Sequence, residues 1–258
     1  MLKNIQTIQS LKGKRAIVAT TAYDTIIAKI ADKASIDILL VGDSVGTTQL
    51  GFDSTVNVTL DMMMHHTSAV VRAQTNALVV ADLPFGYTHD SYQNIFEACR
   101  KLIQVGASAI KIEGGQSIVS TIGRLVASGI PIMGHIGLLP QQINNLGKYR
   151  KFGLDKNEAK ELICDAEALE AAGCFALIGE MVASKTSEII QKAINIPYIG
   201  IGSGPKCDGQ ILVANDLLGF SIDSIPNFVR EFGNLSSKAL EAFKSYKKAV
   251  ENGEFPNE

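Results

Sequence analysis

Ionisable side chains recur in this 258-residue sequence at or just after the ends of short apolar runs. Runs of strand length alternate with longer stretches of helical period, the order expected of parallel strands joined by crossover helices. At the carboxyl ends of such strands, side chains from different strands meet at one rim, where barrel enzymes place their active sites. We therefore expect one shared site for Asp43, Asp82, Lys111, Glu113, His135 and Glu180.

Three of these groups carry negative charge into one confined space. Asp43, Asp82 and Glu113 cannot all ionise there without help, because like charges at short range resist joint ionisation. Either some of the three are protonated or a cation is present. A hard divalent ion suits an all-carboxylate set, and Mg²⁺ suits it best because it retains waters and needs few protein ligands. Zinc is disfavoured because no Cys or His pair is suitably placed.

Each residue also has an ordinary structural explanation. An Asp after a strand, such as Asp43 or Asp82, is often a helix cap or a turn residue. Lys111 and Glu113 share a strand face and could form a simple ion pair, and His135 could be a satisfied core histidine. The recurrence of such groups at five consecutive strand ends favours a functional site.

The apolar runs are continuous and lack polar alternation, which indicates strands buried on both faces, as in a parallel sheet covered by helices. Seven runs fit this description, and an eighth at Ile211–Ala214 fits a strand or a short helix. We predict one (β/α)8 barrel domain over residues 1–258, with an N-terminal and a C-terminal helix; a doubly wound open sheet is the alternative. The seven runs are Ala16–Thr20, Ile38–Gly42, Leu78–Ala81, Ala109–Ile112, Pro131–Gly134, Ala176–Ile178 and Tyr198–Ile201.

Helices are predicted between and after these strands. Their apolar residues recur at three- and four-residue spacings, which places them on one face of a helix. The clearest are Ser91–Val105, Asn157–Ala172 and the C-terminal Ser236–Asn252, whose apolar stripe is Leu240, Phe243, Tyr246 and Val250.

Composition excludes several classes of partner. The chain has 24 Lys and Arg against 26 Asp and Glu, so it lacks the basic excess typical of nucleic-acid or anionic-membrane binding. No apolar stretch approaches the roughly 18 residues of a membrane span. The four cysteines form no CxxC pair. We expect a soluble protein of a reducing compartment, with neither a nucleic-acid nor a membrane partner.

Several short motifs follow one another along the chain. They are Val41–Gly46, Asp53–Thr55 before His66-Thr67, Ala81–Phe85, Val105–Ala107, Ile110–Gly115, Gly134–Leu138, Pro140-Gln141 and Asp208–Val213. With these motifs in this order, the chain resembles the ketopantoate hydroxymethyltransferase (3-methyl-2-oxobutanoate hydroxymethyltransferase) family along nearly its whole length. Because the motifs lie on many separate strands, accidental similarity is improbable.

The resemblance implies an enzyme with a (β/α)8 fold, one Mg²⁺ per subunit and a folate co-substrate. The family transfers a hydroxymethyl unit from 5,10-methylenetetrahydrofolate to 3-methyl-2-oxobutanoate through a magnesium-stabilised enolate. The product, 2-dehydropantoate, leads to pantothenate and coenzyme A. The family forms decamers, so the resemblance also implies a homo-oligomer in the cytoplasm.

The resemblance also assigns roles to individual residues. Asp43, Asp82 and Glu113 match the family's metal-binding acids. Glu180 matches its proton acceptor, and His135 matches a histidine that lines the site; with Lys111 these are the expected catalytic residues. The matches to its keto-acid contacts are Asp43, Ser44, Asp82 and Lys111.

Two other functions fit parts of this pattern. A magnesium-dependent lyase or mutase of the phosphoenolpyruvate mutase type would share the acidic cluster but need no folate. A non-catalytic barrel could bind a keto acid or a metal as a sensor. Glu180 and Lys111 argue against the sensor, because binding alone requires neither a base nor a partner for an enolate.

Overall fold

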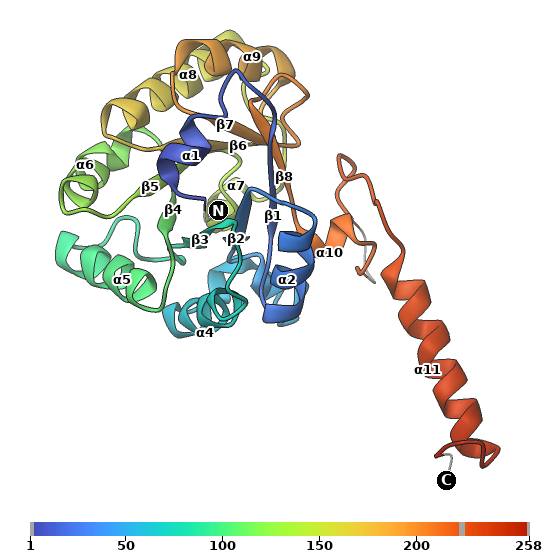
Figure 1. Cartoon of the computed structure of the whole chain (residues 1–258). Coiled ribbons are helices and arrows are strands. Elements are labelled where there is room, and N and C mark those ends of the chain that lie inside the picture. Colours follow the sequence, from blue (N-terminus) through green and yellow to red (C-terminus); the bar gives the residue numbers. More distant parts are fainter. Residues whose placement is uncertain (1–2, 222–224, 257–258) are drawn as a thin grey trace. The chain divides into compact units, whose positions relative to one another are not determined.

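The strands close into a barrel. The computed structural model describes residues 3–221 and 225–256, and in it eight strands pair in sequence order (Figure 1). The described pairings are parallel, and Ile17 N donates to Asp208 O where the last strand meets the first. The predicted (β/α)8 fold is confirmed. The strands are β1 Ile17–Thr21, β2 Ile38–Val41, β3 Leu78–Asp82, β4 Ala109–Glu113, β5 Ile132–Gly137, β6 Ala176–Glu180, β7 Tyr198–Ile201 and β8 Gly209–Leu212.

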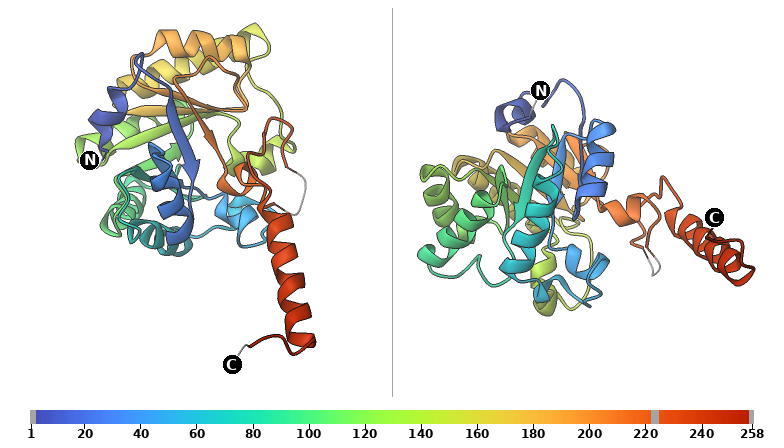
Figure 2. Two further views of the ribbon diagram at one scale, coloured as in Figure 1. Left: turned by 45° about the vertical axis from the view of Figure 1, so that its right-hand side comes forward. Right: turned by 60° about the horizontal axis from the view of Figure 1, so that its bottom comes forward.

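Helices surround the strands, as the two further views in Figure 2 show. Those of the outer ring are α2 Thr25–Lys33, α4 Leu60–Val71, α5 Tyr92–Gln104, α6 Val119–Ala127, α8 Lys156–Ala171 and α9 Ser184–Ala193. Short helices in the loops are α3 Val45–Thr48, α7 Ile143–Leu146 and the 3₁₀ turns η1 Thr55–Asn57, η2 Gln116–Ile118 and η3 Pro140–Gln142.

The strand sequences are apolar throughout because each strand is buried on both sides. In β2, Ile38 and Leu40 belong to the core inside the barrel, whereas Leu39 and Val41 belong to the core between strands and helices. Successive side chains of a strand point to opposite faces, so both sets must be apolar. This arrangement leaves the strand ends as the places where charged groups can gather.

One end of the barrel is covered by the N-terminal helix α1, Ile5–Gln9, which Figure 1 shows across the strands. Ile8 is fully buried and packs in the inner core with Ile17 and Ile38, at the amino ends of β1 and β2. Asn4 caps the helix, its side chain accepting a hydrogen bond from Thr7 N. The predicted N-terminal helix is confirmed, and it closes the end of the barrel opposite the acidic strand ends.

The eighth strand differs from the sequence prediction. It begins two residues before the predicted Ile211–Ala214, and a short helix, α10 Ala214–Leu217, follows it. Both readings were therefore partly right. The first two residues of this strand do not contribute to an apolar run, because Gly209 has no side chain and Gln210 is exposed. A Cβ atom at Gly209 would overlap the carbonyl oxygen of Ile17 on the neighbouring strand, so this close approach requires glycine.

The chain separates into two compact units, Met1–Ile211 and Leu212–Glu258. The second contains α10 and the C-terminal helix α11, Leu235–Glu251, which was predicted as Ser236–Asn252. The predicted apolar stripe of α11 is exposed: Leu240, Phe243, Tyr246 and Val250. The extent of the single domain stays a prediction. Within the described ranges no helix is both long and apolar enough to cross a membrane.

A buried carboxylate fastens the amino end of the chain to β1 and β2. The side chain of Asp37 is fully buried and accepts two hydrogen bonds of 2.7 Å from Arg15 and one of 3.0 Å from Val18 N. Lys3 Nζ lies 3.0 Å from its Oδ1. Burial raises the pKa of this carboxyl group, but the bonds from Arg15, Val18 and Lys3 outweigh burial and lower the pKa from 3.8 to about 2.

We predict that Asp37→Asn lowers the free energy of unfolding at neutral pH by about 2 kcal/mol, measured by urea denaturation. Because the folded pKa is depressed, this contribution is complete above about pH 5 and disappears as the pH falls toward 2. The variant should therefore lose less stability than the wild type over that range. Asp61→Asn, at an exposed position in the first turn of α4, is the control. Equal stability of wild type and Asp37→Asn at neutral pH would refute this role.

Candidate active site

The strand register places the predicted site residues beside one another. Asp82 of β3 is opposite Lys111 of β4, and Glu113 of β4 is opposite His135 of β5. Glu180 of β6 is opposite Gly137, two residues beyond His135. Residues in register on parallel strands point to the same face, so these side chains meet at the carboxyl end of the barrel. The structure thus brings the sequence-predicted groups together.

Lys111 lies among the carboxylates. Its ammonium nitrogen is 3.2 Å from Asp82 Oδ1 and 4.0 Å from Glu113 Oε1, and the residue is 5% exposed. Burial lowers the pKa of a lysine, but the charges of Asp82, Glu113 and Asp43 outweigh burial and raise the pKa above its ordinary value. Lys111 therefore stays positively charged at physiological pH.

The three acids are deeply buried, and their negative charges are only partly balanced by Lys111. Asp43, Asp82 and Glu113 are at most 4% exposed. Burial raises the pKa of Asp82 to about 7 and that of Glu113 well above its ordinary value, although Lys111 opposes both effects. The pKa of Asp43 is raised for the same reason. One ammonium group does not neutralise this cluster, so a further cation would stabilise its ionised form.

Each acid has one oxygen fixed by a protein N–H group. Asp43 N donates to Asp82 Oδ2 at 3.0 Å. Gln141 donates twice, from its backbone N to Glu113 Oε2 at 3.2 Å and from Nε2 to Asp43 Oδ2 at 2.8 Å. In the part of the chain that the structure describes, Asp82 Oδ1 and Glu113 Oε1 are buried without a hydrogen bond. Lys111 approaches Asp82 Oδ1 as an ion pair only.

These two oxygens fit a hard cation. Among residues 3–221 and 225–256, no three His, Cys, Asp or Glu side chains converge closely enough to enclose a metal ion. Mg²⁺ does not require such enclosure, because it commonly binds one or two carboxylates and completes its shell with waters and substrate oxygens. The buried oxygens of Asp82 and Glu113 that accept no hydrogen bond suit that mode of binding. The complete ligand set Asp43, Asp82 and Glu113 stays a prediction.

His135 connects Lys111 to Glu180. Lys111 Nζ is 3.2 Å from His135 Nδ1, and since an ammonium group only donates, Nδ1 accepts and the ring proton is on Nε2. Nε2 faces Glu180 Oε2 at 3.4 Å, without hydrogen-bond alignment. Burial, reinforced by the charge of Lys111, lowers the pKa of His135 well below its usual value. The imidazole is therefore neutral.

Glu180 has the properties of a general base. Its side chain is 18% exposed, and burial raises its pKa to about 7, opposed by Lys111. A carboxylate with a pKa near the operating pH is both available as a base and basic enough to accept a proton. Leu138 N donates to Glu180 O at 2.8 Å, and Gly137, at φ +92°, makes room for that oxygen. The strand ends of β5 and β6 thus fix the base.

Ser44 precedes α3 beside Asp43 without a side-chain capping bond, and its hydroxyl is instead 2.8 Å from the hydroxyl of Tyr23. Burial raises the pKa of Tyr23 to about 12, so this phenol keeps its proton. A Cβ atom at Gly42 would come within 2.8 Å of Ser44 Oγ, so Gly42 leaves room for the serine. Sequence reasoning missed Tyr23, although its position two residues after β1 was a usable signal.

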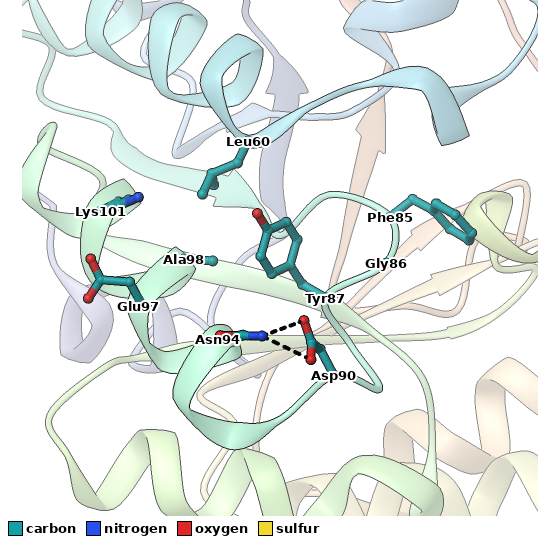
Figure 3. A pocket seen from close by; sticks show the side chains of 9 residues that line it. All are labelled: Leu60, Phe85, Gly86, Tyr87, Asp90, Asn94, Glu97, Ala98 and Lys101. Atoms are coloured by element: carbon teal, nitrogen blue, oxygen red, sulfur yellow. Dashed lines mark hydrogen bonds between the residues drawn. The ribbon is translucent and has the colours of Figure 1, made fainter.

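A separate pocket of about 450 Å³ lies beside α5, outside this cluster (Figure 3). Asn94 donates to both carboxylate oxygens of Asp90 there, and the Tyr87 ring lies near Leu60. None of the predicted catalytic or metal-binding residues lines this pocket. The pocket therefore does not belong to the acidic site.

The fold is shared with several solved enzymes. The chain superposes on 2,3-dimethylmalate lyase, a PEP mutase/isocitrate lyase superfamily member, with a TM-score of 0.64 and 14% identity, over 98% of this chain and 89% of that one. Phosphonopyruvate hydrolase in complex with oxalate and Mg²⁺ gives 0.62 and 14% identity, over 98% and 88%. These likenesses establish a common barrel architecture.

Sequence relationships are much closer. The enzyme named 3-methyl-2-oxobutanoate hydroxymethyltransferase from Thermotoga neapolitana is 45% identical over 99% of this chain and 94% of its own length. The enzyme of the same name from Clostridium acetobutylicum is 46% identical over 100% and 94%. The sequence model of the family described as ketopantoate hydroxymethyltransferase matches residues 3–258. This chain is an enzyme that belongs to the ketopantoate hydroxymethyltransferase family.

Proposed function

We propose that this enzyme transfers a hydroxymethyl unit from 5,10-methylenetetrahydrofolate to 3-methyl-2-oxobutanoate and forms 2-dehydropantoate. The observation that carries the proposal is a part-buried carboxylate, Glu180, next to a site with a fixed ammonium group and excess negative charge. The name shared by relatives at about 45% identity supports this substrate pair.

The first requirement is removal of the proton at C3 of the oxo acid. Glu180 accepts this proton, because its raised pKa matches that of a base working near neutral pH. Lys111 donates toward the substrate oxygen on which negative charge develops, since its ammonium group is fixed and desolvated at the strand ends. Neutral His135 lies between the two and holds them apart without adding a charge.

Mg²⁺ is the proposed cofactor, with Asp43, Asp82 and Glu113 as the residues that would hold it. When bound, it supplies Lewis-acid polarisation of the oxo group and balances the acids. Ser44 and Asp43 lie beside this position and are proposed, with Asp82 and Lys111, to contact the oxo acid. The complex of phosphonopyruvate hydrolase with oxalate and Mg²⁺ supports the pairing of a small dianion with this cation on the same fold.

The overall transfer balances with water as a third reactant. A carbon–carbon bond forms between C3 of the oxo acid and the one-carbon unit, and the bonds from that unit to the two folate nitrogens break. The C3 proton, taken up by Glu180, passes to one nitrogen. Water supplies the hydroxyl group of the product and a proton to the other nitrogen, which leaves tetrahydrofolate.

We predict that the purified enzyme with Mg²⁺ forms 2-dehydropantoate from 3-methyl-2-oxobutanoate only when 5,10-methylenetetrahydrofolate is present. The product can be measured by mass spectrometry with a labelled one-carbon unit. The rival function is tested in parallel with 2,3-dimethylmalate and phosphonopyruvate as substrates. Cleavage of either one without folate, together with no labelled product, would replace the transferase by a lyase.

Glu180→Gln is expected to slow exchange of the C3 proton of 3-methyl-2-oxobutanoate in heavy water by at least about 100-fold, because the amide cannot accept the proton. Proton NMR follows the exchange without folate, so the test isolates this step. Glu188→Gln is the matched control, since the Glu188 side chain on α9 is 40% exposed and is paired with Lys192. Unchanged exchange in Glu180→Gln would remove Glu180 from the role of base.

The same exchange should depend on pH in a defined direction. Because burial raises the pKa of Glu180 to about 7, the ionised base becomes more abundant as the pH rises through that value. At low Mg²⁺ the rate should therefore increase to a plateau above neutral pH. A bound cation favours the ionised form, so added Mg²⁺ should move the midpoint to lower pH. A rate that declines with rising pH between 5 and 8, as for an essential acid, would contradict this assignment.

A further inference from the structure

Gln141 is a buried residue in the turn that follows β5, and it contacts three other strand ends. It lies in η3, Pro140–Gln142, and is 6% exposed. Its backbone N donates to Glu113 at the end of β4, and its side chain donates to Asp43 after β2. The same side-chain nitrogen donates to Leu83 O, just after β3, at 2.9 Å.

The orientation of the amide group follows from its partners. Nε2 faces a carboxylate oxygen and a carbonyl oxygen, both of which only accept hydrogen bonds, so the nitrogen and not the oxygen must occupy this position. Both amide protons are then used. The bond to Leu83 O fixes the amide plane, and the other proton is held toward Asp43 Oδ2.

The neutrality of Gln141 also matters. Its side-chain amide donates to Asp43 Oδ2 at 2.8 Å, so it fixes this carboxylate without adding a positive charge. A Lys or Arg here would cancel part of the charge that attracts a cation. An apolar side chain would leave Asp43 without this donor.

We propose that Gln141 is a positioning residue for the cation site, which it prepares by fixing one oxygen of Asp43 and one of Glu113. Each carboxylate thereby has one oxygen held by Gln141, and the second oxygen of Glu113, Oε1, lies 4.0 Å from Lys111 Nζ. Hydrogen-bond partners behind metal ligands commonly change metal affinity by about 10- to 100-fold. This inference rests on the proposed function, because it assumes that these acids hold a divalent cation.

The test is direct binding of Mn²⁺, a paramagnetic substitute for Mg²⁺, measured by electron paramagnetic resonance on the full chain without substrates. Gln141→Met keeps the length of the side chain and removes both of its donors, while the backbone bond to Glu113 remains. We expect Mn²⁺ to bind at least about tenfold more weakly. Gln142→Met is the matched control, since Gln142 is the exposed neighbour in the same turn, and it should bind Mn²⁺ like the wild type.

A second variant distinguishes a loss of metal affinity from a general folding defect. Gln141→Asn keeps the amide but is one methylene shorter, so its Mn²⁺ affinity should lie between those of wild type and Gln141→Met. A merely structural role would lower the melting temperature of the metal-free protein and leave the Mn²⁺ dissociation constant unchanged. Equal affinity of wild type and both variants would overturn the inference. No Mn²⁺ binding by the wild type would instead refute the metal site of the proposed function.

Discussion

The site depends on one electrostatic constraint, the confinement of four carboxyl groups with a single ammonium group at the end of a barrel. Asp43, Asp82, Glu113 and Glu180 face Lys111, and burial raises the pKa of all four acids. The barrel can hold this arrangement because its strands and outer helices are apolar and closely packed. The core thus holds a concentration of charge that water would otherwise screen, and this is the charge that the proposed cation would balance.

Lys111 and His135 divide this charge into two regions. Lys111 stays ionised beside Asp82 and Glu113, whereas His135 stays neutral and separates them from Glu180. Glu180 is therefore influenced mainly by burial and by Lys111, which leaves its pKa near 7. The neutral ring does not isolate Glu180 completely, because its charge contributes to the raised pKa of Asp43 and of Glu113.

The sequence was sufficient to predict the fold and the six ionisable groups at the strand ends, because buried parallel strands and their polar termini leave a clear local pattern. Other features depend on contacts between distant segments. The start of β8 at Gly209 was missed because a glycine in a sequence usually indicates a turn. Here it is required because the backbone of Ile17 leaves no room for a side chain. The role of Gln141 was not apparent from its motif, since it arises only where β2, β3 and β4 end together. Tyr23 was missed because its partner Ser44 lies 21 residues away.

The position of helix α1 limits the routes by which reactants and products can reach the site. It covers the amino-terminal end of the barrel, and the inner layer of side chains fills the space behind it. Reactants and products therefore share the opening formed by the loops after the strands. Both substrates of the proposed reaction would therefore have to enter and leave from the same side of the barrel, which makes the loops after the strands the one place where access to the site can be controlled.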